Sequence, residues 1–170
     1  GTYAFSKALR DAKEKPIIGC EVYCQGTNGQ NENNHLILLC KNETGYQNLC
    51  KILTEAENNF YRHANVTIDN LRKYSEGLIA LSACLAGELA RQILADNEDK
   101  AEEFIETMID IFGDDFYVEL QNHNLVEEMR VRRVLVKLAK EFGLKTVATT
   151  DSHYLNKEDA GAHEVLLCIG

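Results

Sequence analysis

Apolar residues recur along this chain at two different spacings. Short β-branched and apolar runs have the character of strands, and between them apolar residues recur every three or four positions, as on a helix. The strand-like runs cover residues 17–23, 35–40, 78–83, 116–121 and 145–150. The helical spacing covers 3–14, 43–58, 86–95, 98–112, 125–142 and 158–168, and Thr67 opens a further short helix.

The alternation of these two patterns predicts an α/β fold. Strands that alternate with helices form a parallel sheet joined by crossover helices. Residues 26–34 are rich in glycine and asparagine and read as a flexible loop. Neither an internal repeat nor an interdomain linker divides the chain, so we expect one domain over residues 1–170.

The composition places the chain among globular proteins and limits how it can meet nucleic acid. Hydrophobic residues make up 45% of the sequence and charged residues 26%, and the net charge is −9. An acidic domain does not hold DNA by bulk electrostatics, so metal ions or a basic neighbour must supply that attraction. No apolar run is long enough to cross a bilayer, so we expect no membrane partner.

Side chains that can bind metal lie at or near the ends of the predicted strands. Asp151 and His153 follow the last strand, and side chains two residues apart on extended backbone point the same way. Cys84 follows the third strand and is expected to lie on the same face as the small residues Ser82 and Ala80. Glu21 lies late in the first strand. His35 begins its strand, which is the wrong end if all strands are parallel.

Two more polar side chains, Gln121 and His123, lie just past the fourth strand. Active sites gather at the carboxyl ends of strands in parallel barrels, so these residues are expected to converge. Carboxylate, imidazole and thiolate together suit zinc, with manganese or iron as alternatives. Each residue also has a purely structural interpretation, such as an edge charge, a core thiol or a solvated imidazole.

Five blocks of the sequence carry a family resemblance: 15–23, 35–46, 74–88, 150–155 and 159–169. In this order they resemble the PHP (polymerase and histidinol phosphatase) domain of bacterial replicative DNA polymerases, of the DNA polymerase III α-subunit type. The resemblance implies a distorted (β/α)7 TIM-like barrel. It also implies a metal site with Gln121 and His123 as neighbours and with ligand positions at Glu21, His35, Cys84, Asp151 and His153.

The sequence departs from the family at its start. Family members open with a His-x-His strand and a Thr-Asp-His-Gly block, and the sequence contains neither. We therefore expect an incomplete barrel with its first strands missing and a metal cluster with part of its ligands. Exposed sheet edges would then favour self-association.

The resemblance also implies a function. The parent would be a cytoplasmic bacterial polymerase, with DNA, the remainder of its chain and other replicase subunits as partners. Its PHP site would hydrolyse phosphodiesters as a 3′–5′ exonuclease, although we expect weak or no catalysis from this chain alone. Two alternatives stay open. The first is a non-catalytic scaffold that braces the polymerase and binds a proofreading subunit. The second is a stand-alone PHP phosphatase acting on a small phosphate ester.

Overall fold

The computed structural model describes residues 1–30, 32–58, 60 and 63–169. Six strands form one sheet with the order β3-β1-β2-β4-β5-β6. The strands are β1 (Gly19–Cys24), β2 (Asn34–Cys40), β3 (Asn65–Val66), β4 (Leu78–Leu81), β5 (Phe116–Leu120) and β6 (Lys145–Ala148). The five predicted strands are therefore present, and the two-residue strand β3 is the one that the pattern missed.

Seven α-helices accompany the sheet among the described residues. They are α1 (Thr2–Asp11), α2 (Glu43–Asn58), α3 (Ile68–Tyr74), α4 (Glu88–Leu94), α5 (Glu98–Phe112), α6 (Val126–Glu141) and α7 (Ala160–Leu167). Gly113 and Gly143 follow α5 and α6 with positive φ angles of 54° and 66°, a conformation that glycine adopts without steric cost. None of the described helices is both long and apolar enough to cross a membrane.

The α/β class is confirmed, but the sheet is mixed rather than wholly parallel. Strand β2 runs antiparallel to both β1 and β4, whereas the β1–β3, β4–β5 and β5–β6 pairs are parallel. Among the described residues between β1 and β2 there is no helical segment, and the two strands are antiparallel, so their connection is a return loop rather than a crossover. Within the described residues β3 and β6 each have one strand neighbour, so the sheet is open, as in an incomplete TIM-like barrel.

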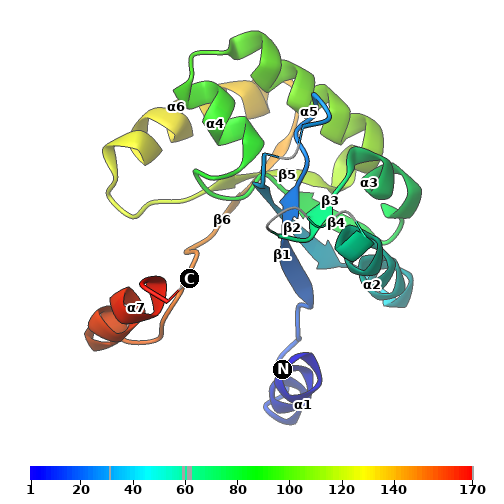
Figure 1. Ribbon diagram of the computed structural model, residues 1–170, viewed down its shortest axis with the longest axis vertical. Coiled ribbons are helices and arrows are strands. Elements are labelled where there is room, and N and C mark those ends of the chain that lie inside the picture. The colour runs from blue at the N-terminus through cyan, green and yellow to red at the C-terminus, as the bar shows by residue number, and fades with distance from the viewer. Residues whose placement is uncertain (31, 59, 61–62, 170) are drawn as a thin grey trace.

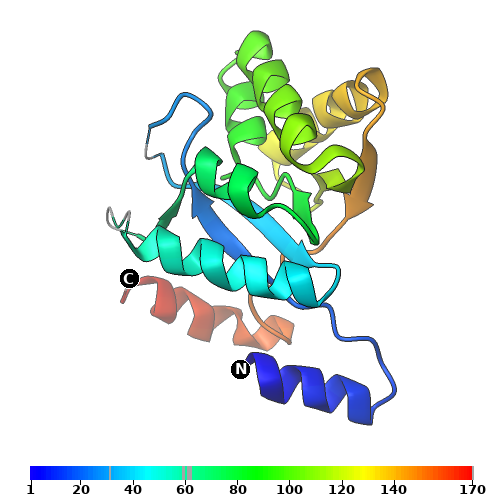
Figure 2. The same cartoon turned by 90° about the vertical axis from the view of Figure 1, so that its right-hand side faces the viewer.

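The hydrophobic core lies between the sheet and the helices from α2 to α6, which form an arc around the strands (Figure 1). Its most deeply buried side chains include Leu36, Leu38, Ile105, Met108, Phe116 and Val118. Helices α1 and α7 lie below this arc in Figure 1, away from the helices that cover the sheet, and neither contains a buried residue. In the turned view of Figure 2, both lie on the side of α2 that faces away from the sheet. The packed body thus extends from β1 to β6.

Candidate metal centre

The antiparallel pairing of β1 and β2 brings Glu21 and His35 together. Tyr23 pairs directly with His35, and Glu21 lies two residues before Tyr23, so the Glu21 and His35 side chains project from one face of the sheet. Because β2 is antiparallel, its first residues lie beside the last residues of β1 and β4. His35 therefore lies at the same edge of the sheet as the ends of β1 and β4, although it is near the beginning of its own strand.

Cys84 reaches this pair through a turn after β4. Strand β4 ends at Leu81, and Ala83 has a φ of 63°, in the left-handed region that side chains other than glycine seldom adopt. Regular alternation would have placed Cys84 with Ala80, which pairs with the buried Leu38. The expectation that Cys84 shares that face is wrong, because the left-handed residue redirects the chain toward His35.

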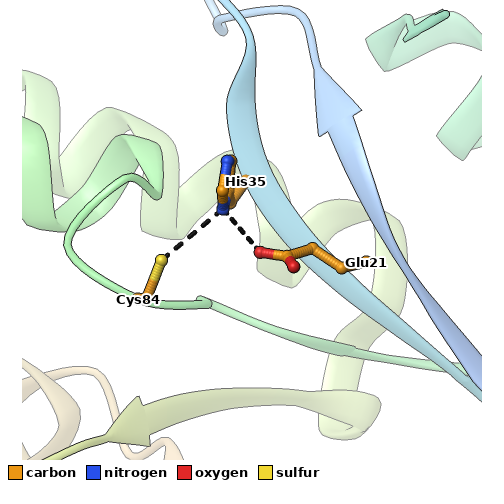
Figure 3. A group of neighbouring side chains, drawn as sticks. All are labelled: Glu21, His35 and Cys84. Carbon is orange, nitrogen blue, oxygen red and sulfur yellow. Dashed lines mark hydrogen bonds and ion pairs between the residues drawn. The ribbon is translucent and has the colours of Figure 1, made fainter. Parts of the chain in front are cut away.

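Glu21, His35 and Cys84 form a compact group, here called the triad (Figure 3). The His35 Nδ1 atom lies 2.5 Å from Glu21 Oε1 and 3.5 Å from Cys84 Sγ. One ligand atom from each residue lies within 4.8 Å of the others. Ligand atoms of a tetrahedral zinc ion lie about 3.3–3.8 Å apart. The distance between His35 and Cys84 falls in this range, whereas Glu21 and His35 are at hydrogen-bond distance and would have to separate to bind an ion.

The surroundings of the triad favour an uncharged thiol in the absence of a cation. Cys84 is half-buried, and this burial raises its pKa, with the negative charges of Asp151 and Glu21 adding to the rise. The Tyr23 and His35 rings pack in a T-shaped arrangement, with 5.2 Å between the ring centroids. A bound cation would offset the two carboxylate charges and stabilise the Cys84 thiolate.

Asp151 and His153, the other two predicted ligands, lie outside the triad. Strand β6 ends at Ala148, and Asp151 has a left-handed φ of 44°, so the extended geometry expected for this pair is wrong. The His153 Nδ1–H group donates to the Asp151 backbone carbonyl at 2.8 Å, and its ring packs on His163 of α7. The Asp151 charge still acts on Cys84, so its carboxylate lies within electrostatic reach of the triad.

Gln121 and His123 contact the segment that precedes Asp151. The Gln121 side-chain amide donates to Glu119 Oε1 at 3.1 Å and to Thr149 Oγ1 at 3.4 Å. The His123 ring lies between the Glu128 carboxylate and the Thr150 backbone carbonyl. Among the described residues, these contacts make both side chains neighbours of the Asp151 segment rather than members of the triad.

Sequence reasoning passed over two buried carboxylates next to these residues. Glu119 and Glu128 are each only 5% exposed. Glu119 Oε2 has no hydrogen-bond partner within the described part of the chain, and Glu119 lines a cavity of about 20 Å³ together with Cys84 and Gln121. A cavity of this size holds about one water molecule. Glu128 could have been noticed as an acidic residue in the first turn of a predicted helix.

Comparison with known proteins identifies the family of the chain. The model of the PHP domain family matches residues 1–123. The chain is 42% identical to the DNA polymerase III subunit alpha of Borreliella burgdorferi, covering 100% of this chain and 16% of that protein. The subunit from Thermus aquaticus is also 42% identical (99% and 15% covered), and that from Aquifex aeolicus is 40% identical (99% and 16% covered). The chain thus spans about one-sixth of the length of these relatives, and it belongs to the PHP domain family.

Proposed function

We propose that this chain is the PHP module of a bacterial replicative DNA polymerase and that its triad anchors a metal-dependent phosphodiester hydrolysis site. The 3′–5′ exonuclease direction suits a module whose neighbour would extend primer ends. The observation that supports this most is the convergence of Glu21, His35 and Cys84 from three separate segments onto one edge of the sheet. The cytoplasmic location and the partnership with DNA, the polymerase chain and other replicase subunits follow from the same proposal.

The donor set fits a borderline-soft divalent cation. One carboxylate oxygen, one imidazole nitrogen and one thiol sulfur are a combination that zinc accepts readily, and manganese or iron fits if more oxygen and nitrogen ligands join. We propose that Asp151 and His153 complete the coordination shell from the segment after β6.

Glu21, His35 and the neighbouring Tyr23 would have different roles in binding the ion. His35 would give its Nδ1 lone pair to the ion, and the proton between His35 and Glu21 would leave on binding. Glu21 would neutralise the ion's charge, and Tyr23 would hold the imidazole plane. A divalent ion bound there supplies Lewis acidity and makes water a nucleophile near neutral pH. Its positive charge would also attract a phosphodiester to a chain of net charge −9.

The scaffold function remains a second candidate, because a specific observation favours it. The apolar side chains Val165, Leu166 and Leu167 of α7 are 62%, 64% and 67% exposed. Exposed apolar patches of this kind are typical of protein–protein contact surfaces. A proofreading subunit or the polymerase body would fit such a surface. A stand-alone phosphatase has no comparable support, since the relatives compared above are polymerase subunits.

Metal binding by the purified chain tests the proposal. We expect about one equivalent of zinc or cobalt, and we expect Cys84→Ser to raise the Kd by about tenfold or more. Cys50→Ser is the matched control, because Cys50 is an exposed free thiol on α2 outside the triad. In the complete polymerase chain, Glu21→Gln should abolish metal-dependent shortening of primer 3′ ends. A chain that binds no metal, or binds it equally well without Cys84, would refute the catalytic proposal and leave the scaffold.

A further inference from the structure

His123 has hydrogen-bond acceptors at both of its ring nitrogens. Nδ1 lies 2.6 Å from Glu128 Oε1, and Nε2 lies 2.7 Å from the backbone carbonyl oxygen of Thr150. A carboxylate and a carbonyl oxygen can only accept, so each nitrogen must carry a proton for both bonds to form. With an ionised Glu128, only the imidazolium form of the ring satisfies both bonds, and in that form neither nitrogen has a lone pair free for a metal ion.

The Glu128 carboxylate stabilises a charged His123 ring through two hydrogen bonds to that residue. Its Oε2 atom accepts the His123 backbone N–H at 2.5 Å, and Glu128 is only 5% exposed. Glu128 is the third residue of α6, after the N-cap Leu125, where a glutamate commonly accepts from the backbone before the helix. A buried carboxylate needs such partners, because an uncompensated buried charge is costly.

The Thr150 carbonyl, which accepts the hydrogen bond from His123, lies one residue before Asp151. Beyond the end of β6, Thr149 is also tied to β5: its N–H donates to the Leu120 carbonyl at 3.2 Å, and its hydroxyl donates to Glu119 Oε1. These bonds hold residues 149 and 150 in place where the sheet ladder has ended. Asp151 then turns left-handed at a φ of 44° and begins the segment that carries His153.

We propose that His123, charged and backed by Glu128, is a positioning residue that fixes the backbone at Thr150, and with it the start of the segment from which Asp151 and His153 would reach the metal ion. It acts through the Thr150 carbonyl and is not itself a ligand. The part that concerns ligand presentation depends on the proposed function, since it takes Asp151 and His153 as completing the metal site. The part that concerns fixing the backbone stands on the geometry of the metal-free chain.

Two neutral substitutions separate the two bonds of the ring. The amide nitrogen of glutamine can occupy the place of Nε2, so His123→Gln keeps a donor for the Thr150 carbonyl. The amide nitrogen of asparagine corresponds to Nδ1, so His123→Asn keeps a donor for Glu128 and loses the bond to Thr150. If His123 only stabilised the start of α6 through Glu128, the asparagine variant would resemble the wild type more closely than the glutamine variant. The proposal predicts the opposite, that the glutamine variant resembles the wild type more closely.

The first readout needs no metal. In the 170-residue chain, ¹⁵N relaxation should give order parameters for residues 151–153 that fall below about 0.6 in His123→Asn and stay near the wild-type values in His123→Gln. Equal order parameters in the wild type and the asparagine variant would overturn the proposal, whatever the metal does.

The second readout uses Co²⁺ as a spectroscopic probe. In His123→Asn, the thiolate-to-cobalt charge-transfer band from Cys84 should persist, the ligand-field bands should change, and the Kd for Co²⁺ should rise about tenfold or more. His123→Gln should restore the wild-type bands. Unchanged ligand-field bands in a loosened asparagine variant would overturn ligand presentation by His123. A wild-type chain that binds no Co²⁺ would instead refute the proposed metal function, and the relaxation result would then decide the backbone role alone.

Discussion

At the scale of single residues, side-chain chemistry could be read from the sequence, but side-chain direction could not. Residue type, position on the predicted strands and the family resemblance together identified Glu21, His35 and Cys84 as candidate ligands, and the fold brings these three together. The directions of Cys84 and Asp151 were misjudged, because both follow from left-handed backbone, at Ala83 and at Asp151 itself. An alanine or aspartate in that region is uncommon, and no periodic pattern announces it.

Gly87 offers a residue-scale test of the turn that carries Cys84. A Cβ atom at Gly87 would lie 2.3 Å from the Ser82 carbonyl oxygen, and its backbone N–H donates to the Cys84 carbonyl at 3.0 Å. We expect Gly87→Ala to lower the free energy of unfolding by about 1–3 kcal/mol in urea titrations, because the turn must move to make room.

Gly161→Ala is the matched control for that substitution. A Cβ atom there meets nothing within 4 Å, and the residue lies in helix α7, where alanine is preferred to glycine. It should therefore be neutral or slightly stabilising. Equal effects of the two substitutions would mean that the turn at Gly87 is not tightly packed.

At the scale of elements, the pattern located five of the six strands and the helices between them, but not the strand directions. The hydrophobic pattern of a strand is the same whether the strand pairs in a parallel or an antiparallel direction. The direction of β2 decides whether His35 lies next to Glu21. The return loop was not predicted, although no helical spacing lies between the first two strand-like runs and this absence could have indicated it. Strand β3 escaped notice because two residues are too few to show alternation.

The junction of α4 with the loop after β1 gives an element-scale prediction about pH. Glu88, in the first turn of α4 and 4% exposed, accepts hydrogen bonds from the Thr27 backbone N–H at 3.1 Å and from the Thr27 hydroxyl at 2.6 Å. Burial raises the pKa of Glu88, although the bonds from Thr27 lower it in part. Between the ordinary pKa of a glutamate and this raised value, the folded state therefore binds more protons than the unfolded state.

The sign of the effect follows from that difference. The contribution of Glu88 to stability is fully present below the unfolded pKa, which is about 4.5, and it falls as the pH rises through the folded value. Chemical denaturation at a series of pH values should show this loss in the wild type and its absence in Glu88→Gln. If the difference in stability between the two proteins does not vary with pH, this account of Glu88 is wrong.

At the scale of the whole molecule, the family resemblance predicted the architecture of the sheet, which hydrophobic periodicity could not do. An alternation of strands and helices predicts the α/β class, but it does not distinguish an open mixed sheet from a closed parallel barrel. The resemblance supplied the expectation of an incomplete barrel, and the sheet is open between its edge strands β3 and β6 within the described residues. The separation of α1 and α7 from the packed core had no signature in the sequence, since helical periodicity does not say what a helix packs against.

The exposed apolar side chains of α7 lead to a prediction about association. Leu166 and Leu167 are 64% and 67% exposed, so burying them against a second copy removes apolar surface from water. We expect sedimentation velocity to show concentration-dependent self-association of the isolated chain. Leu166→Asp together with Leu167→Asp should shift it toward monomer. A wild-type chain that stays monomeric at every concentration would contradict this expectation.

The measurement that tests the central claim most directly is X-ray absorption spectroscopy of the zinc-loaded chain. If Glu21, His35 and Cys84 hold the ion, the spectrum should contain one sulfur neighbour at about 2.3 Å with nitrogen and oxygen neighbours at about 2.0–2.2 Å, and Cys84→Ser should remove the sulfur shell. A shell of nitrogen and oxygen alone in the wild type, or a sulfur shell that survives the loss of Cys84, would contradict the account.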